Sequence, residues 1–400
     1  MTYNVERIRA DFPSLTSGVA HFDGPGGSQV PASVAQAVAA TLISPISNRG
    51  TITESERNAE KTVVDFRSAV SDLLNCQPNG VIFGRSWTQI SYDLSRAMAK
   101  EWAAGDEIVV TRLEHDSNLR PWIQAAQAVG AIVRWAEIDV TTGELPLEAV
   151  RSVINKKTKL VTVTGASNIL GTRPEIIEIG KAARAVGAIF VVDGVHLTPH
   201  APIDVKKLGA DIYGFSSYKL LGPHCGIAVG DPALLEKIHN DKLLPSTMVV
   251  PERFEFGTLP YEILAGVTAS IDYVAGMLGV SGGTRRERIV ASMTALEEYE
   301  ANLFAYMETE IKKIPGIKTY GHAKNRTPTL YFNLNGVEPI AMYHHLAKLK
   351  VNAPASNFYS IEPSRALGLG DAGAVRAGLA PYSTRGEVDR LIEGINSFTL

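Results

Sequence analysis

Short runs rich in valine and isoleucine alternate with stretches of helical periodicity between about residues 80 and 230. The runs have the length and composition of buried strands. This alternation predicts an α/β fold with a mostly parallel, seven-stranded sheet flanked by helices, whose ligands bind at the carboxyl ends of the strands. The expected strands lie at 81–83, 107–111, 132–135, 160–164, 189–192, 212–215 and 227–229. The expected helices between them lie at 89–102, 120–128, 147–154, 175–186 and 203–208.

The pattern changes after about residue 265, where two long helical stretches precede a mixture of strands and helices. This change predicts a smaller α+β C-terminal domain. We place the large domain at 19–270 and the small domain at 271–400, and expect the N-terminal segment 1–18 to pack on the small domain. The expected elements of the small domain are helices at 262–278, 285–314, 339–348 and 385–398 and strands at 329–333 and 374–379.

The composition excludes several classes of protein. A net charge of −3 gives no sign of binding to nucleic acid or to an anionic membrane, and no stretch is apolar enough to span a bilayer. The two cysteines, Cys76 and Cys225, are too few for a disulfide framework, and no secretory signal or zinc-type spacing is present. We therefore expect a cytoplasmic protein without a metal site. The glycine-rich motifs of dehydrogenases and P-loop hydrolases are also missing.

Two strands are predicted to end in residues that carry chemistry. One ends at Asp193, and another leads into Ser216, Ser217, Tyr218 and Lys219. The carboxyl ends of parallel strands share one edge of a sheet, so Asp193 and Lys219 are expected to meet. Taken singly, each is an ordinary turn or surface residue. As a pair they are what pyridoxal 5′-phosphate (PLP) requires: a carboxylate that keeps the pyridine nitrogen protonated and an amine that forms a Schiff base.

A second candidate segment follows the first expected strand. Ser86, Trp87 and Thr88 end that strand and open a helix. The free N–H groups and the positive dipole end of such a helix bind phosphate. On its own the segment also fits an ordinary Ser/Thr helix cap, but together with the Lys219 segment it predicts the site of the cofactor phosphate.

The ordered set of motifs resembles the class V aminotransferase family of fold-type I PLP-dependent transferases, in its cysteine-desulfurase-like and isopenicillin-N-epimerase-like branch. The resemblance covers nearly the whole chain, from Phe22-Asp23 to 376–387. It is carried by Glu114-His115-Asp116-Ser117-Asn118, Ser167-Asn168-Ile169-Leu170-Gly171, Asp193-Gly194-Val195-His196, Ser216-Ser217-Tyr218-Lys219, Arg253-Phe254-Glu255-Phe256-Gly257-Thr258 and Val375-Arg376-Ala377-Gly378.

The resemblance implies a role for each matching residue. Lys219 would form the Schiff base and then move protons, Asp193 would pair with the pyridinium, and His115 would stack on the ring. Asn168 and His196 would reach the ring hydroxyl. The residues implied around the phosphate are Ser86, Trp87, Thr88, Ser216 and Tyr218.

The resemblance also implies a homodimer with shared active sites, because Thr258 would reach a phosphate across the subunit interface. Arg376 would bind the α-carboxylate of a small amino-acid substrate, a task suited to its planar pair of donors.

Three departures from the family pattern narrow the expected function. Tyr218 replaces the usual histidine before the lysine, and Ser86-Trp87 replaces the common Gly-Thr. The late loop at 353–360 lacks the cysteine that desulfurases need as a mobile thiolate. We therefore expect a lyase, epimerase or aminotransferase acting on a small amino acid. The alternatives are a cysteine desulfurase or selenocysteine lyase that works without that cysteine, and a non-catalytic PLP-binding protein.

Overall fold

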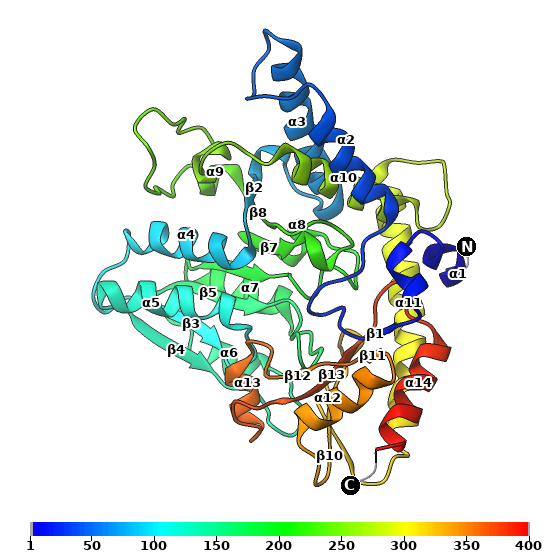
Figure 1. Ribbon diagram of the computed structural model, residues 1–400. Helices are drawn as coiled ribbons and strands as arrows, with labels where there is room; N and C mark the ends of the chain where they lie inside the picture. The colour runs from blue at the N-terminus through cyan, green and yellow to red at the C-terminus, as the bar shows by residue number, and fades with distance from the viewer. Residues whose placement is uncertain (1–2, 399–400) are drawn as a thin grey trace.

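The computed structural model describes residues 3–398, and a seven-stranded sheet lies at its centre, in the order β2-β8-β7-β6-β5-β3-β4 (Figure 1). β7, β6, β5, β3 and β4 run parallel, whereas β8 is antiparallel to both β7 and β2. The predicted α/β fold with a mostly parallel sheet is confirmed. The strands are β2 (Val81–Gly84), β3 (Glu107–Thr111), β4 (Ile132–Ala136), β5 (Thr158–Thr164), β6 (Ile189–Asp193), β7 (Ile212–Ser216) and β8 (Gly226–Gly230).

Helices cover both faces of this sheet. Successive side chains of a strand point to opposite faces, so one strand contributes apolar side chains to two cores. Ile108 and Val110 of β3 pack in one core with α4 (Trp87–Ala99) and α5 (Arg120–Val129). Val109, between them, packs in a second core that contains α7 (Ile176–Ala185) and α10 (Tyr261–Gly276). Shorter helices complete the large unit: α6 (Leu147–Arg151), α8 (Val205–Leu208) and α9 (Pro232–Leu235).

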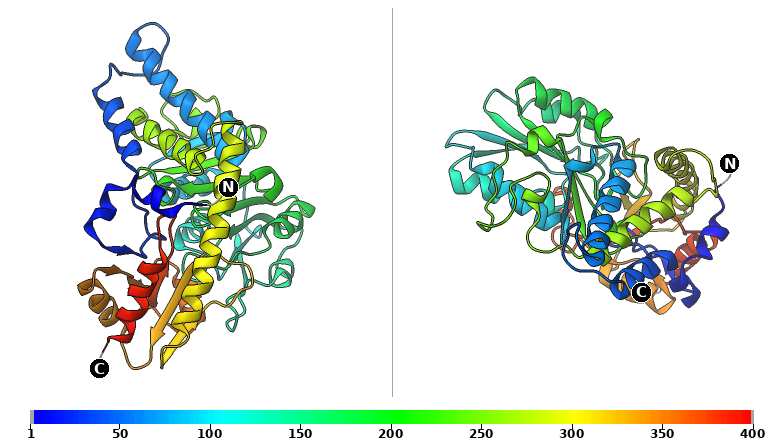
Figure 2. Two further views of the ribbon diagram at one scale, coloured as in Figure 1. Left: turned by 90° about the vertical axis from the view of Figure 1, so that its right-hand side faces the viewer. Right: turned by 90° about the horizontal axis from the view of Figure 1, so that it is seen from above.

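Two helices were not predicted, α2 (Ala32–Ile43) and α3 (Glu54–Leu74), which pack on α10 and extend away from the sheet (Figure 1). The long helix α11 (Arg285–Ile311) contacts α3 and α10 and also α14 (Arg385–Asn396), and runs along one side of the molecule (Figure 2). α11 therefore packs both on helices of the large unit and on a helix of the C-terminal part.

The C-terminal part contains a four-stranded antiparallel sheet in the order β12-β13-β10-β9, which gives the predicted α+β unit. β1 (Ala20–His21) pairs with β11 (Val351–Asn352), and Arg9 forms a 3.0 Å ion pair with Glu387 of α14. The expected domain boundary at 270/271 falls inside α10, and the division into these two domains stays a prediction. The remaining elements are α1 (Val5–Arg9), β9 (Ile317–Tyr320), β10 (Thr329–Leu334), α12 (Pro339–Lys348), β12 (Ala355–Ser356), α13 (Ile361–Ala366) and β13 (Ala374–Gly378).

Across residues 3–398, no helix has both the length and the apolar character needed to cross a membrane.

Candidate active site

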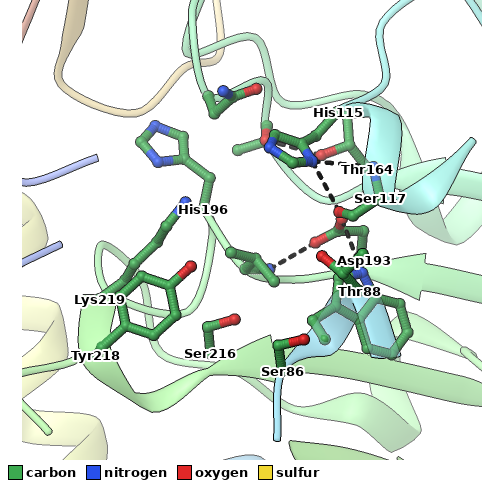
Figure 3. Close-up of a pocket in the computed structure, with 14 residues that line it drawn as sticks. Ser86, Thr88, His115, Ser117, Thr164, Asp193, His196, Ser216, Tyr218 and Lys219 are labelled. Atoms are coloured by element: carbon green, nitrogen blue, oxygen red, sulfur yellow. Dashed lines mark hydrogen bonds between the residues drawn. The ribbon is translucent and has the colours of Figure 1, made fainter. Parts of the chain in front are cut away.

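Polar side chains gather at the carboxyl edge of the large sheet, as expected for parallel strands. Thr164, Asp193 and Ser216 are the last residues of the neighbouring strands β5, β6 and β7, and Lys219 ends the short 3₁₀ turn that follows β7 (Figure 3). Ten of the predicted site residues line one cavity: Ser86, Trp87, Thr88, His115, Asn168, Asp193, His196, Ser216, Tyr218 and Lys219.

Lys219 and Asp193 are both buried in this cavity. Burial and the nearby Arg376 guanidinium lower the pKa of Lys219, while Asp193 opposes the shift. Burial raises the pKa of Asp193, and the Val195 N–H, Lys219 and the Trp87 indole act against the rise. The two side chains therefore have perturbed ionisation, as catalytic groups in clefts often have.

His115 is held as a neutral imidazole. Its Nδ1 accepts the Ser117 N–H at 3.1 Å and lies 2.7 Å from the Ser117 hydroxyl (Figure 3), which leaves the ring proton on Nε2. Burial, Lys219 and Arg376 lower the pKa of His115 to about 3. An uncharged, flat ring of this kind can lie against an aromatic cofactor without bringing a second cation beside Lys219.

Glu114, next to His115 in the chain, fixes this segment to the sheet. Its carboxyl group is fully buried and accepts hydrogen bonds from the Thr111 hydroxyl at 2.6 Å, the Asn118 amide at 2.7 Å and the Thr164 N–H at 2.9 Å. Burial raises the pKa of Glu114 to about 8. The sequence analysis quoted Glu114 and Asn118 as part of a motif but assigned them no role, and the contacts identify them as supports for His115.

His196 presents an unpartnered nitrogen within the cavity. Its Nε2 lies 2.9 Å from the Thr329 hydroxyl, whereas its buried Nδ1 has no hydrogen-bond partner among residues 3–398. Asn168 lines the same cavity, but its amide donates to the Phe358 carbonyl at 3.0 Å and its Oδ1 accepts from the Ser360 hydroxyl. Of the two residues predicted to reach the ring hydroxyl, His196 therefore has the free polar atom.

The first turn of α4 forms another wall. Ser86 caps the helix by accepting the Gln89 N–H at 3.1 Å, and the N–H groups at the start of a helix have no partner within it. Ser216 lies next to Ser86, and Tyr218 lies beyond Ser216 (Figure 3). The Tyr218 ring stacks on His224 with centroids 4.8 Å apart. Hydroxyl and N–H donors thus converge on one end of the cavity.

Arg376 of β13 faces an adjoining cavity of about 610 Å³ that Lys219 and His115 also line. The guanidinium donates to the Asn168 carbonyl at 3.0 Å and lies 3.7 Å from the centre of the Phe358 ring. Its Nε has no partner, and no carboxylate in residues 3–398 lies within ion-pair distance. Burial lowers the pKa of Arg376 to about 9, so it remains a cation at neutral pH.

Thr258 is the one predicted site residue that lies elsewhere. It is exposed and lines a separate cavity with Phe254 and Phe256. Ser117 and Thr164 also line the cavity that contains Lys219, although the sequence assigned neither of them a role. The side-chain contact of Trp87 with Asp193 was not predicted either. Within the described chain, no cluster of three or more His, Cys, Asp or Glu side chains is arranged to hold a metal ion.

The geometry agrees with comparisons to known proteins. The family model for aminotransferase class-V matches residues 20–391. The chain belongs to the class V aminotransferase family. It is 34% identical to an uncharacterized protein of Mycobacterium tuberculosis (99% of this chain and 100% of that protein) and 30% identical to a cysteine desulfurase of Yersinia pestis (99% and 98%). The structure of a cysteine desulfurase from Thermococcus onnurineus superposes with a TM-score of 0.88 at 26% identity, covering 98% of this chain and 97% of that one.

Membership of this family makes the chain an enzyme that uses PLP. The residues present fit that group. His196 has an unpartnered Nδ1 that suits a ring hydroxyl. The buried pair Asp193 and Lys219 suits a pyridine nitrogen and an aldehyde, and the N–H groups at the start of α4 suit a phosphate.

Proposed function

We propose that this class V family enzyme cleaves a bond at Cα or Cβ of a small amino acid, as a lyase, an epimerase or an aminotransferase. The observation that carries the proposal is Arg376, a buried cation that faces the same cavity as Lys219 and has no carboxylate within ion-pair distance among residues 3–398, although the nearby Asp23 favours its charge. An unpaired buried charge is costly. A substrate carboxylate would neutralise it and would bring the α-carbon toward the lysine.

In this proposal each side chain does a defined task. When bound, PLP supplies an electron sink for the bonds at Cα. Lys219 supplies the amine that holds the cofactor and later moves a proton at Cα, and its lowered pKa gives more neutral amine than an exposed lysine has. Asp193 holds the proton on the pyridine nitrogen. Neutral His115 lies against the ring.

The cysteines argue against a desulfurase that uses a loop thiolate. Burial raises the pKa of both Cys76 and Cys225 to about 12, so neither is a thiolate at neutral pH. Neither lines the cavities that contain Lys219 and Arg376, and the late loop 353–360 has no cysteine. A thiol nucleophile must be ionised and accessible.

A second candidate is a cysteine desulfurase or selenocysteine lyase that works without a loop thiol. It is favoured by the 30% identity to a cysteine desulfurase over 99% of the chain. The two candidates differ in product, because this one releases alanine together with sulfide or selenide.

We also propose a homodimer. Large apolar side chains are exposed at the end of α2, where Ile43 is 87% exposed, and in the segment 236–260 that follows α9, which contains Leu243 and Phe256. The Arg49–Glu252 ion pair, at 2.8 Å, ties these two regions together. Burial of this surface against a second copy would remove apolar area from water and would bring Thr258 toward the partner's cofactor.

The first experiment is a visible absorbance spectrum of the purified protein, followed by borohydride reduction and peptide mapping. We expect a yellow protein in which reduction fixes the cofactor to Lys219. Lys219→Ala should lose the reducible link, whereas Lys181→Ala, which removes an exposed lysine, should keep it. A label on another lysine would contradict the assignment of Lys219.

The reaction is then identified by screening amino acids for a change in that spectrum and analysing the products in deuterium oxide. A keto acid formed without free ammonia identifies an aminotransferase, a keto acid formed together with free ammonia identifies a lyase that eliminates a group from Cβ, and loss of optical purity with deuterium at Cα identifies an epimerase. Alanine with sulfide or selenide supports the second candidate. Bound cofactor without a spectral change for any amino acid would contradict both and leave a non-catalytic binding protein.

A further inference from the structure

The side chain of Trp87 reaches the carboxylate that is proposed to hold the cofactor. Its indole Nε1–H donates to Asp193 Oδ2 at 3.0 Å, and both side chains are buried. The other oxygen of Asp193, Oδ1, accepts the Val195 N–H at 2.9 Å. Each carboxylate oxygen therefore has one fixed donor, and the carboxylate plane is set by two elements, the start of α4 and the turn after β6.

The indole is held in place by glycines on neighbouring strands. A Cβ on Gly214 of β7 would clash with the Trp87 ring, and a Cβ on Gly226 of β8 would clash with the backbone of Ser86 and Trp87. Trp87 is 2% exposed and packs in the core between α4 and the sheet. The indole therefore lies directly against the backbone of β7, with its N–H directed at Asp193.

We propose that Trp87 is a positioning residue, which orients the Asp193 carboxylate toward the pyridine nitrogen of the cofactor and weakens its basicity through the indole N–H. The inference rests on the proposed role of Asp193. It gives a function to the Trp87 side chain, whereas the sequence analysis assigned only a place near the phosphate.

The charges around Asp193 fit this role. Lys219 is the cation that faces it from the turn after β7, and Glu114, Tyr213 and Tyr218 are the other titratable groups that interact with it. Burial raises the pKa of all three of these neighbours, which disfavours a second negative charge beside Asp193. The N–H groups of Trp87 and Val195 are the neutral donors that stabilise the carboxylate form.

The test replaces Trp87 by phenylalanine, which removes the N–H and keeps an aromatic ring. The matched control is Trp122→Phe in α5, because Trp122 is also fully buried but its indole N–H has no partner among the described residues. Two quantities are measured on the full-length protein: the dissociation constant for PLP and the pH midpoint of the visible band of the bound cofactor. Neither needs a substrate.

Trp87→Phe should weaken PLP binding by about tenfold or more, the scale of one hydrogen bond to a charged group. It should also raise the pH midpoint by about one unit, because the loss of the indole dipole removes positive potential from the pyridine end. Trp122→Phe should change neither quantity. In an Asp193→Ala background, which removes both acceptor oxygens, Trp87→Phe should have no more effect than the control.

Equal effects of Trp87→Phe and Trp122→Phe would overturn the inference, as would full additivity with Asp193→Ala. If Trp87→Phe does not fold, replacement of Trp87 by benzothienylalanine, which has the shape of tryptophan but no N–H, decides the matter by the same two measurements. Borohydride labelling of a lysine other than Lys219 would instead refute the proposed function itself, so the two failures are distinguishable.

Discussion

Arg376→Met should separate substrate binding from stability. The guanidinium is buried without a carboxylate in ion-pair distance among the described residues, and the nearby Asp23 offsets only part of the cost, which is several kcal/mol. The hydrogen bond to the Asn168 carbonyl recovers about 1.5–3 kcal/mol, and the stack on Phe358 about 2 kcal/mol. These terms nearly cancel. We therefore expect the variant to match or exceed the wild type in the free energy of unfolding by up to about 2 kcal/mol, since methionine has no charge to desolvate.

Binding of the amino acid should fall sharply in the same variant. Loss of one partner of a buried, hydrogen-bonded charge pair costs about 2–5 kcal/mol, which corresponds to roughly 30-fold to 5000-fold in affinity. The assay is a titration of the visible band with the amino acid that gives the largest spectral change, alongside urea unfolding of both proteins.

The amine that has the same side chain as this amino acid but no α-carboxylate serves as the control ligand. The wild type should bind the amino acid much more tightly than this amine, whereas Arg376→Met should bind the two about equally. Retention of the preference in Arg376→Met would refute the reasoning, because the carboxylate would then have another partner. A large loss of stability would also refute it, since Arg376 would then be serving the fold.

Three further predictions follow from single contacts. Phe358→Leu should weaken amino-acid affinity roughly 5- to 30-fold by removing the ring beneath Arg376, with little change in PLP affinity in a parallel titration. Gly214→Ala should destabilise the protein by about 1–3 kcal/mol in urea unfolding, because its Cβ meets the Trp87 ring, while Gly276→Ala, which points into open space, should not. Glu107→Gln should be less stable than wild type at pH 7. The Arg134 guanidinium and the Asn155 amide hold the pKa of Glu107 at about 2 against a usual 4.5, so stability present above pH 4.5 is lost as the pH falls toward 2, and the difference between the two proteins should shrink over that window. A difference that persists unchanged at low pH would argue against the ionised carboxylate as its source.

The central sheet and the edge that carries the site were predictable because their signals are local. Strand runs of buried valine and isoleucine stand out against helical spacing, and residues that follow parallel strands must meet at one edge. Ten predicted residues consequently line one cavity. The helices α2 and α3 were missed, although α3 begins at a capping box formed by Thr53 and Glu56. Their place is decided by packing on α10, which lies far along the chain.

The direction of individual side chains could not be predicted from local sequence. Trp87 could be placed at a helix start, but its indole points at Asp193 only because Gly214 and Gly226 leave that space. Likewise, Arg376 was matched to a motif, but its stack on Phe358 depends on a loop in which Phe358 and Tyr359 both adopt positive φ, at 52° and 60°. Non-glycine residues in that conformation are strained and occur often at functional sites.

Two of the three departures from the family pattern, Ser86-Trp87 and Tyr218, line the same cavity. Trp87 is larger than the usual residue there, and the glycines at 214 and 226 make room for it. Tyr218 replaces a histidine, and its flat ring lies on His224 at an interplanar angle of 8°. Burial raises the pKa of Tyr218, so this position stays neutral at the pH values where a histidine would gain charge. The proposed phosphate donors Ser86, Thr88, Ser216 and Tyr218 are thus all uncharged. If these residues hold the phosphate as proposed, the dipole of α4 supplies much of the local positive potential, and we expect the start of that helix, with Trp87 bonded to Asp193, to contribute strongly to cofactor binding.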